Sequence, residues 1–236
     1  MKALKLHFRW LLLVCAFVAN VSSASAQTVS GCDTLNTRQL CIVKIAANTG
    51  SGDLERLKPA LAEGLDNGMT INEIREILVH AYAYCGFPRS LRALQTFIEV
   101  LDKRKEQGIK DIAGRDASPM TDSRSRYERG RDILAEISGV PADGPKAAYA
   151  VFAPVIERFL KEHLFADLFE RDVLSYDERE LTTISVIAVL GESVESMLRG
   201  HLAICRHLGY TEDQLAQAQT IAVCNFDKKS KTIKTE

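Results

Sequence analysis

The stretch of sequence that decides the fold reads Glu76-Ile77-Leu78-Val79-His80-Ala81-Tyr82-Ala83-Tyr84-Cys85-Gly86-Phe87-Pro88-Arg89. Its apolar residues recur three and four positions apart, which is the spacing of one face of an α-helix. The glycine near its end predicts the stop of this helix, and the proline two residues later predicts the first turn of another. The stretch therefore predicts two successive helices with a sharp break at Gly86.

The same helical spacing extends over most of the chain. It recurs in residues 40–47 and 54–65, and no segment between turn residues alternates apolar and polar side chains as a strand would. Further helices are expected over residues 124–137 and, as one long helix, from about 145 to 169. We therefore predict an all-α protein.

An internal repeat divides the chain. A shift of 141 residues aligns it with itself without a gap, pairing for example Arg38 with Arg179 and Gly50 with Gly191. Each copy reads as helix, break, helix, Gly-x-Thr turn and helix, and the turn threonines, Thr70 and Thr211, each begin a capping box. We predict a first unit over residues 37–107, a linker over 108–123, a second unit over 124–227 and a charged tail over 228–236.

The N-terminus has the pattern of a secretory signal peptide over residues 1–26. A basic head precedes an apolar run, residues 10–18, and a small-x-small site ends at Ala26. The run is about half the roughly 20 residues that a membrane-spanning helix needs. We expect a flexible leader over residues 27–36, a periplasmic or secreted protein, and no membrane span after cleavage.

Charge and cysteine content narrow the function classes. With 30 basic and 31 acidic residues the chain has no basic field for a nucleic acid, so we expect no nucleic-acid partner. The histidines and cysteines lack the spacing of a metal site, so no metal is expected. Five of the six cysteines follow the signal peptide, namely Cys32, Cys41, Cys85, Cys205 and Cys224. Their pairing stays open, although small buried positions are expected for Cys41, Cys205 and Cys224.

Glu76, His80 and Tyr84 lie four residues apart and share one helix face. A carboxylate one turn before an imidazole can hydrogen-bond it and raise its pKa, as suits an acid/base histidine. Arg89 follows near a helix start, where it can hold a substrate carboxylate. The same spacing is also that of an ordinary stabilising helix pair, so both readings stay open.

The stretch resembles the Glu-x-x-x-His-x-x-x-Tyr-x-Gly-x-Pro motif of the carboxymuconolactone decarboxylase family, here as Glu76, His80, Tyr84, Gly86 and Pro88. The second copy is similar to another stretch of that family, in Arg179-Glu180-Leu181 through Gly191, in Leu198-Arg199-Gly200-His201-Leu202 and in Leu208-Gly209-Tyr210-Thr211. The resemblance covers most of residues 37–224.

The resemblance implies two related helical units of the carboxymuconolactone decarboxylase or alkylhydroperoxidase-D-like type, assembled into trimers or hexamers. The family's decarboxylases use no cofactor and release CO₂ from a small lactone that carries a carboxylate. His80 would be the proton donor and Glu76 its orienting partner. Tyr84 and Arg89 would position the substrate. His201 is expected to face the same cleft, from the other copy or from a neighbouring subunit. A carboxy-lyase or isomerase of a small carboxylated lactone or related acid is the implied function.

Two departures from the family keep alternatives open. Gln217 and Ile221 stand at the second-copy positions of Glu76 and His80, so at most one catalytic centre per chain is expected. The family's thiol peroxidases use a Cys-x-x-Cys pair that this chain lacks, which leaves a single-thiol redox role for Cys85 as one alternative. A non-catalytic, oligomeric ligand-binding module is the other.

Overall fold

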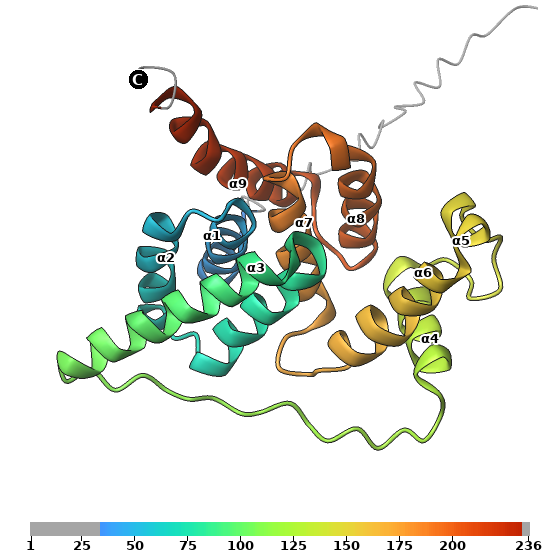
Figure 1. The fold of residues 1–236 in the computed structure, drawn as a ribbon, viewed down its shortest axis with the longest axis horizontal. Coiled ribbons are helices and arrows are strands. Elements are labelled where there is room, and N and C mark those ends of the chain that lie inside the picture. The colour runs from blue at the N-terminus through green and yellow to red at the C-terminus, as the bar shows by residue number, and fades with distance from the viewer. Residues whose placement is uncertain (1–33, 233–236) are drawn as a thin grey trace, which may run out of the picture. The chain divides into compact units, whose positions relative to one another are not determined.

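The computed structural model describes residues 34–232, and the expected signal peptide lies outside this range. Within it every regular element is helical, which confirms the all-α prediction (Figure 1). None of these helices is long and apolar enough to cross a membrane. The elements are α1 (Thr37–Ser51), α2 (Leu54–Asp66), α3 (Ile71–Glu106), α4 (Arg126–Ser138), α5 (Ala148–Phe152), α6 (Pro154–Phe159), the π-helical η1 (Leu160–Leu168), α7 (Tyr176–Ala188), the 3₁₀ turn η2 (Glu192–Val194), α8 (Glu195–His207) and α9 (Glu212–Thr232).

The helix boundaries follow the sequence repeat. Helix α8 begins and ends 141 residues after α2, and α9 begins 141 residues after α3. The predicted capping boxes are both present. Glu73 accepts from the backbone of Thr70 at 2.7 Å, and Gln214 accepts from that of Thr211 at 3.0 Å. The two related helical units are thus confirmed, with α1 to α3 in the first and α7 to α9 in the second.

Helix α3 is bent at the predicted break (Figure 1). Gly86 has φ 81° and ψ 159°, a conformation that a residue with a Cβ rarely adopts, and Pro88 opens the helical turns that follow. Beyond the bend, the hydroxyl of Ser90 donates to the carbonyl of Leu78 at 2.7 Å. This bond ties the second half of α3 to the first, which carries Glu76 and His80.

The single helix expected over residues 145–169 is wrong. The chain forms α5, α6 and η1 instead, with a break at Ala153, where φ is −130° and ψ is 78°. Pro154 explains the break, because it disfavours the helical conformation of the residue before it and has no N–H to continue the bond ladder. The helix expected over residues 124–137 is confirmed as α4.

Two of the three hydrophobic clusters in the described residues carry most of the packing, and the third is a small contact of Ala47, Val189 and Ala222. The larger one joins the two units, and its fully buried side chains include Ile42, Ile45, Leu57, Leu61, Ile74, Ile77, Leu78 and Leu181. The smaller one lies between α4 and η1 and is formed by Ile133, Ile137, Leu164, Phe165, Leu168 and Phe169. The ring of Phe169 packs edge-on against that of His80 at 5.2 Å between centroids, so the smaller core borders the candidate site.

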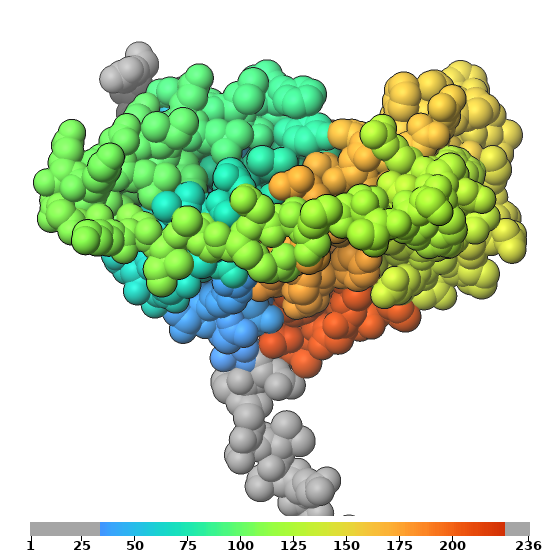
Figure 2. Space-filling model, turned by 90° about the horizontal axis from the view of Figure 1, so that it is seen from below, coloured from blue at the N-terminus to red at the C-terminus, as the bar shows by residue number. Residues whose placement is uncertain are grey.

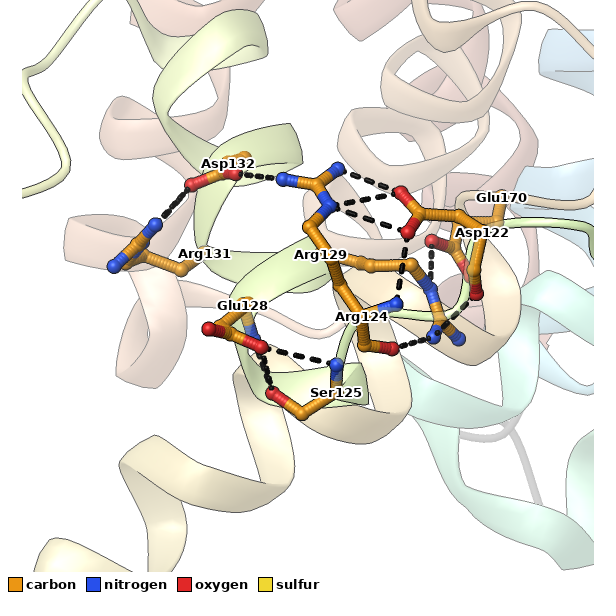
Figure 3. A network of polar contacts seen from close by, with 8 residues as sticks. All are labelled: Asp122, Arg124, Ser125, Glu128, Arg129, Arg131, Asp132 and Glu170. Carbon is orange, nitrogen blue, oxygen red and sulfur yellow. Dashed lines mark hydrogen bonds and ion pairs between the residues drawn. The ribbon is translucent and has the colours of Figure 1, made fainter.

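The expected linker crosses one face of the molecule between α3 and α4 (Figure 2). It is fixed at several points, since Arg104 donates to Asp111 at 2.8, 2.9 and 3.1 Å, and Ser118 donates to Asp172 at 2.8 Å. At its end, Arg129 donates to Glu170 at 2.7 Å and to backbone carbonyls of the segment before α4 (Figure 3). The linker between α3 and α4 is therefore held in place by these side-chain contacts.

The packing of α1 against α7 gives a prediction about two glycines. A Cβ on Gly50 would lie 2.9 Å from a methyl of Val189 and 3.1 Å from the backbone of Val186. A Cβ on Gly200, in the exposed middle of α8, would meet no atom within 4 Å. We expect Gly50→Ala to lower the free energy of unfolding by about 1–3 kcal/mol through overpacking. Gly200→Ala should raise it by up to about 1 kcal/mol, because alanine favours helices. Urea unfolding measures both, and equal signs for the two variants would contradict this packing.

Candidate functional site

The site is built around a buried carboxylate. Glu76 on α3 is 1% exposed and accepts hydrogen bonds from Arg171 at 2.6 and 2.9 Å and from Arg179 at 3.3 Å. Arg179, on α7, is fully buried, whereas the side chain of Arg171, in the segment before α7, is 39% exposed. Burial alone would raise the pKa of Glu76, but the two guanidinium groups outweigh it and lower this pKa. Glu76 is therefore a charged anchor between the two units.

His80 is also fully buried, and its hydrogen bonds show which of its ring nitrogens carries the proton. Its Nε2 lies 2.9 Å from Thr183 Oγ1, whose own proton is donated to the carbonyl of Arg179 at 3.0 Å. The imidazole must therefore donate from Nε2. Its Nδ1, 3.4 Å from Arg179 Nη1, then accepts. We assign the neutral Nε2–H tautomer to His80.

The pKa of His80 is lowered in the structure, whereas the sequence analysis expected Glu76 to raise it. Burial, then the charge of Arg179 and that of His201, lower this pKa well below its ordinary value of 6.5. The prediction that Glu76 raises the pKa of His80 is wrong, because Glu76 bonds to the arginines and it is Arg179 that contacts the imidazole. His80 is held neutral at physiological pH.

A carboxylate–imidazole pair lies beside Glu76, His80 and Arg179. His201 on α8 contacts Glu180 on α7 through Nδ1 and Oε2 at 2.8 Å. The Glu180 side chain is fully buried, and that of His201 is 17% exposed. The kind of pair expected within α3 is thus found in the second unit, between two helices, and its imidazole reaches the surface.

Tyr84 joins the two histidines into one cluster. Its ring centroid lies 5.5 Å from that of His80 and 5.4 Å from that of His201, the latter in an edge-on arrangement. Burial, and then the negative charge of Glu180, raise the pKa of Tyr84 well above 10. Its phenol therefore keeps its proton at neutral pH and can serve as a donor.

Two buried polar atoms of this cluster, Arg179 Nε and one oxygen of Glu180, have no hydrogen-bond partner among the described residues. Buried polar groups are nearly always hydrogen-bonded, because an unmade bond costs about 1–3 kcal/mol. One donor and one acceptor, both on α7, therefore have no protein partner in the described part of the chain.

The structure leaves two predicted site residues outside this hydrogen-bond network. Arg89 is exposed and donates to the carbonyl of Gly50 at the end of α1. The thiol of Cys85 donates to the carbonyl of Ala81 at 3.1 Å, and burial raises its pKa to about 11. Few Cys85 side chains are then thiolate at neutral pH.

The four cysteines in the described part of the chain are free. Cys41 and Cys205 are buried as expected, whereas Cys224 is exposed, so its expected core position is wrong. Within the same range no three histidine, cysteine or acidic side chains gather as metal ligands would.

No sequence pattern assigned a role to Arg171, Arg179, Glu180 or Thr183. The available signal was the adjacent charged pair Arg179-Glu180 at the start of the apolar run that ends at Val189. Charged residues are almost never fully buried unless they are paired, so such a pair within a core helix indicates buried partners elsewhere in the chain.

Removing the anchor charge should destabilise the fold strongly. In Glu76→Gln the fully buried guanidinium of Arg179 loses its counter-ion, which costs about 3 kcal/mol or more of unfolding free energy. Glu195→Gln is the matched control, because the pair of Glu195 with Arg199 is exposed on both sides and contributes little. Urea unfolding at pH 7 compares the two variants. A loss in Glu76→Gln no larger than in the control would show that the ion pair is not an anchor.

The neutral state of His80 predicts a pH dependence. The unfolded chain takes up a proton near pH 6.5 that the folded chain refuses, so the stabilising effect of His80 is full above that pH and falls as the pH is lowered. Between pH 6.5 and 5 this residue should contribute a slope of up to about 1.4 kcal/mol per pH unit. His80→Gln should lose this slope while keeping the contributions of all other groups. Parallel stability curves for the two proteins would refute the assignment.

The comparisons with known proteins agree with the repeat and the fold. The model of the carboxymuconolactone decarboxylase family matches residues 18–99 and 154–227, one region for each copy. The first match begins within the expected signal peptide, at residues outside the described range. A search of curated proteins finds no match to this chain. The two matched regions together cover more than half of the sequence, and the chain belongs to the carboxymuconolactone decarboxylase family.

Proposed function

We propose that this protein is an exported, cofactor-independent acid/base enzyme, a lyase or isomerase of a small carboxylated lactone or related acid. The observation that carries the proposal is the Glu180–His201 pair at 2.8 Å, with its carboxylate fully buried and its imidazole at the surface. A buried carboxylate that holds one imidazole nitrogen leaves the other nitrogen oriented for proton exchange. Family membership supports this reading of the cluster.

His201 takes the role that the sequence suggested for His80. Glu180 fixes Nδ1, so Nε2 is the atom that passes a proton to or from a substrate. Tyr84, whose phenol stays protonated, packs edge-on against the His201 ring and positions it. His80 is sealed, and it acts as a positioning residue through its contacts with Thr183 and Arg179.

The arginines supply the charge that a carboxylated substrate requires. Arg171 is partly exposed, and Arg179 carries an unpartnered Nε in the same cluster. In a decarboxylation, the bond from the ring carbon to the carboxylate carbon breaks and CO₂ leaves. The electron pair passes into the conjugated lactone carbonyl, and His201 returns a proton to carbon. A fixed positive field stabilises the enolate oxygen that forms in this step.

Export and oligomerisation belong to the same proposal. The N-terminal pattern over residues 1–26 supports export. Exposed apolar side chains on α5 and α6 offer a surface for a neighbouring subunit, namely Tyr149, Val151, Phe152, Val155 and Phe159. A homo-oligomer, trimer or hexamer, would cover them.

A non-catalytic ligand-binding module is the second candidate. The complete burial of His80 and Glu76 favours it, because neither group can touch a substrate in this conformation. A thiol redox role is favoured less, since Cys85 is held as a protonated thiol.

Turnover of γ-carboxymuconolactone by the purified chain tests the proposal. His201→Asn should lower kcat/KM at least about 100-fold, because general acid–base groups contribute about 10²–10⁴-fold. His163→Asn is the matched control, since His163 also contacts a carboxylate, that of Asp167 at 3.0 Å, but is 52% exposed. Circular dichroism checks that both variants keep their helices.

The possible results separate the two candidates. Activity retained in His201→Asn would remove His201 from the chemistry. Binding of the lactone without turnover by the unaltered chain would identify a binding module, and neither binding nor turnover would exclude this substrate class.

A further inference from the structure

The half of α3 that follows the bend, residues 87–106, runs along one edge of the fold (Figure 1). Its inner face is buried in the larger core. Its outer face carries three large apolar side chains that are each more than half exposed, namely Phe87, Leu91 and Ile98. Exposed apolar side chains that gather on one surface mark a candidate interface.

These three side chains belong to a regular apolar seam. With the half-buried Leu94 and Leu101 they recur at intervals of four, three, four and three residues. Apolar residues at these intervals form a stripe along a helix, and such a stripe packs lengthwise against another helix. The exposure of three of the five shows that the described part of the chain leaves the seam uncovered. The seam therefore fits a second helix.

The charges beside the seam indicate which helix covers it. Arg92 and Glu99 are both about half exposed, and their contact within α3 is loose, at 3.7 Å, as is that of Glu99 with Lys58 at 3.8 Å. Exposed pairs of this kind contribute little, so both charges are available to a partner. When two copies of the helix run antiparallel about an axis near Gln95, Arg92 of each copy faces Glu99 of the other. In a parallel pair each charge would face its like, so the pattern is complementary to itself only in the antiparallel arrangement.

We propose that residues 87–106 form a two-fold contact between two copies of this chain, with their helices antiparallel. Leu91 of one copy packs against Leu101 of the other, and Leu94 packs against Ile98. The seam exposes roughly 300 Å² of apolar surface per copy, because a large side chain buries about 150–250 Å² when it is fully covered. With the polar rim on both copies, the contact reaches the total of about 1,000 Å² that a specific interface needs.

The contact extends the homo-oligomer of the proposed function, and it lies on a different surface from the apolar side chains of α5 and α6. A two-fold contact joins copies in pairs, so it cannot by itself produce a trimer. It doubles a trimer formed through α5 and α6 into a hexamer, and it gives a dimer if α5 and α6 bind no subunit.

Sedimentation equilibrium of the full chain measures the association. Ile98→Glu should weaken it at least about tenfold, because each pair would bury two charges in an apolar seam. Ile112→Glu is the matched control, because Ile112 is also an exposed isoleucine but lies in the linker after α3, and it should leave the association unchanged. Circular dichroism checks that both variants keep their helices.

Charge reversal tests the antiparallel arrangement. Arg92→Glu and Glu99→Arg should each weaken self-association about tenfold, because like charges then face one another twice in every pair. An equal mixture of the two variants restores both opposite-charge contacts, so native mass spectrometry should find mixed pairs in excess of a random distribution.

Three results would overturn the proposal: an unaltered chain that sediments as a monomer, undiminished association in Ile98→Glu, or a random distribution in the mixture. Phe152→Glu separates this contact from the oligomer of the proposed function. Association lost in Phe152→Glu but kept in Ile98→Glu would place the contact between copies on α5 and α6 alone.

Discussion

The buried ion pair of Glu76 with Arg179 is the constraint on which the site depends. Both side chains are removed from water, and either charge alone would cost several kcal/mol in that environment. Their pairing therefore fixes the first half of α3 against α7, across the boundary between the two units. The other members of the cluster lie on these two helices, on α8, which packs against α7, or, for Arg171, in the segment just before α7. The register of the pair consequently decides which side chains face one another.

The same pair explains why the acid/base histidine is not the one that the spacing favoured. Spacing along a helix identifies partners one turn away, and Glu76 and His80 meet that criterion. It cannot identify an arginine 103 residues further along the chain that takes the carboxylate and places its charge against the imidazole. His80 is thereby kept neutral. The partner of His201, Glu180, is 21 residues distant on another helix, so no local pattern could show it.

The sequence predicted the features that neighbouring residues determine, and it missed those that depend on contacts between distant helices. The helices of the two repeated units, the break at Gly86 and both capping boxes depend on residues close in sequence, and they are confirmed. The break before Pro154 is also local, and it was missed because the apolar spacing continues through it. The partners of buried charges are set by packing between helices. For that reason the family and the fold could be predicted from the sequence, whereas the roles within the site required the structure.

Fusion of the two units into one chain makes their divergence physically possible. In an assembly of identical subunits, a substitution appears at every equivalent position, so a buried pair must be kept or lost everywhere. Here Gln217 replaces the counterpart of Glu76, and its amide oxygen accepts from the backbone of Leu35 at 2.8 Å. Arg38, the counterpart of Arg179, remains 33% exposed and pairs with Glu73 and Glu178 near the surface. Because that arginine is never fully desolvated, the second half needs no buried anion. The neutral Gln217 at this position therefore leaves no buried charge without a partner.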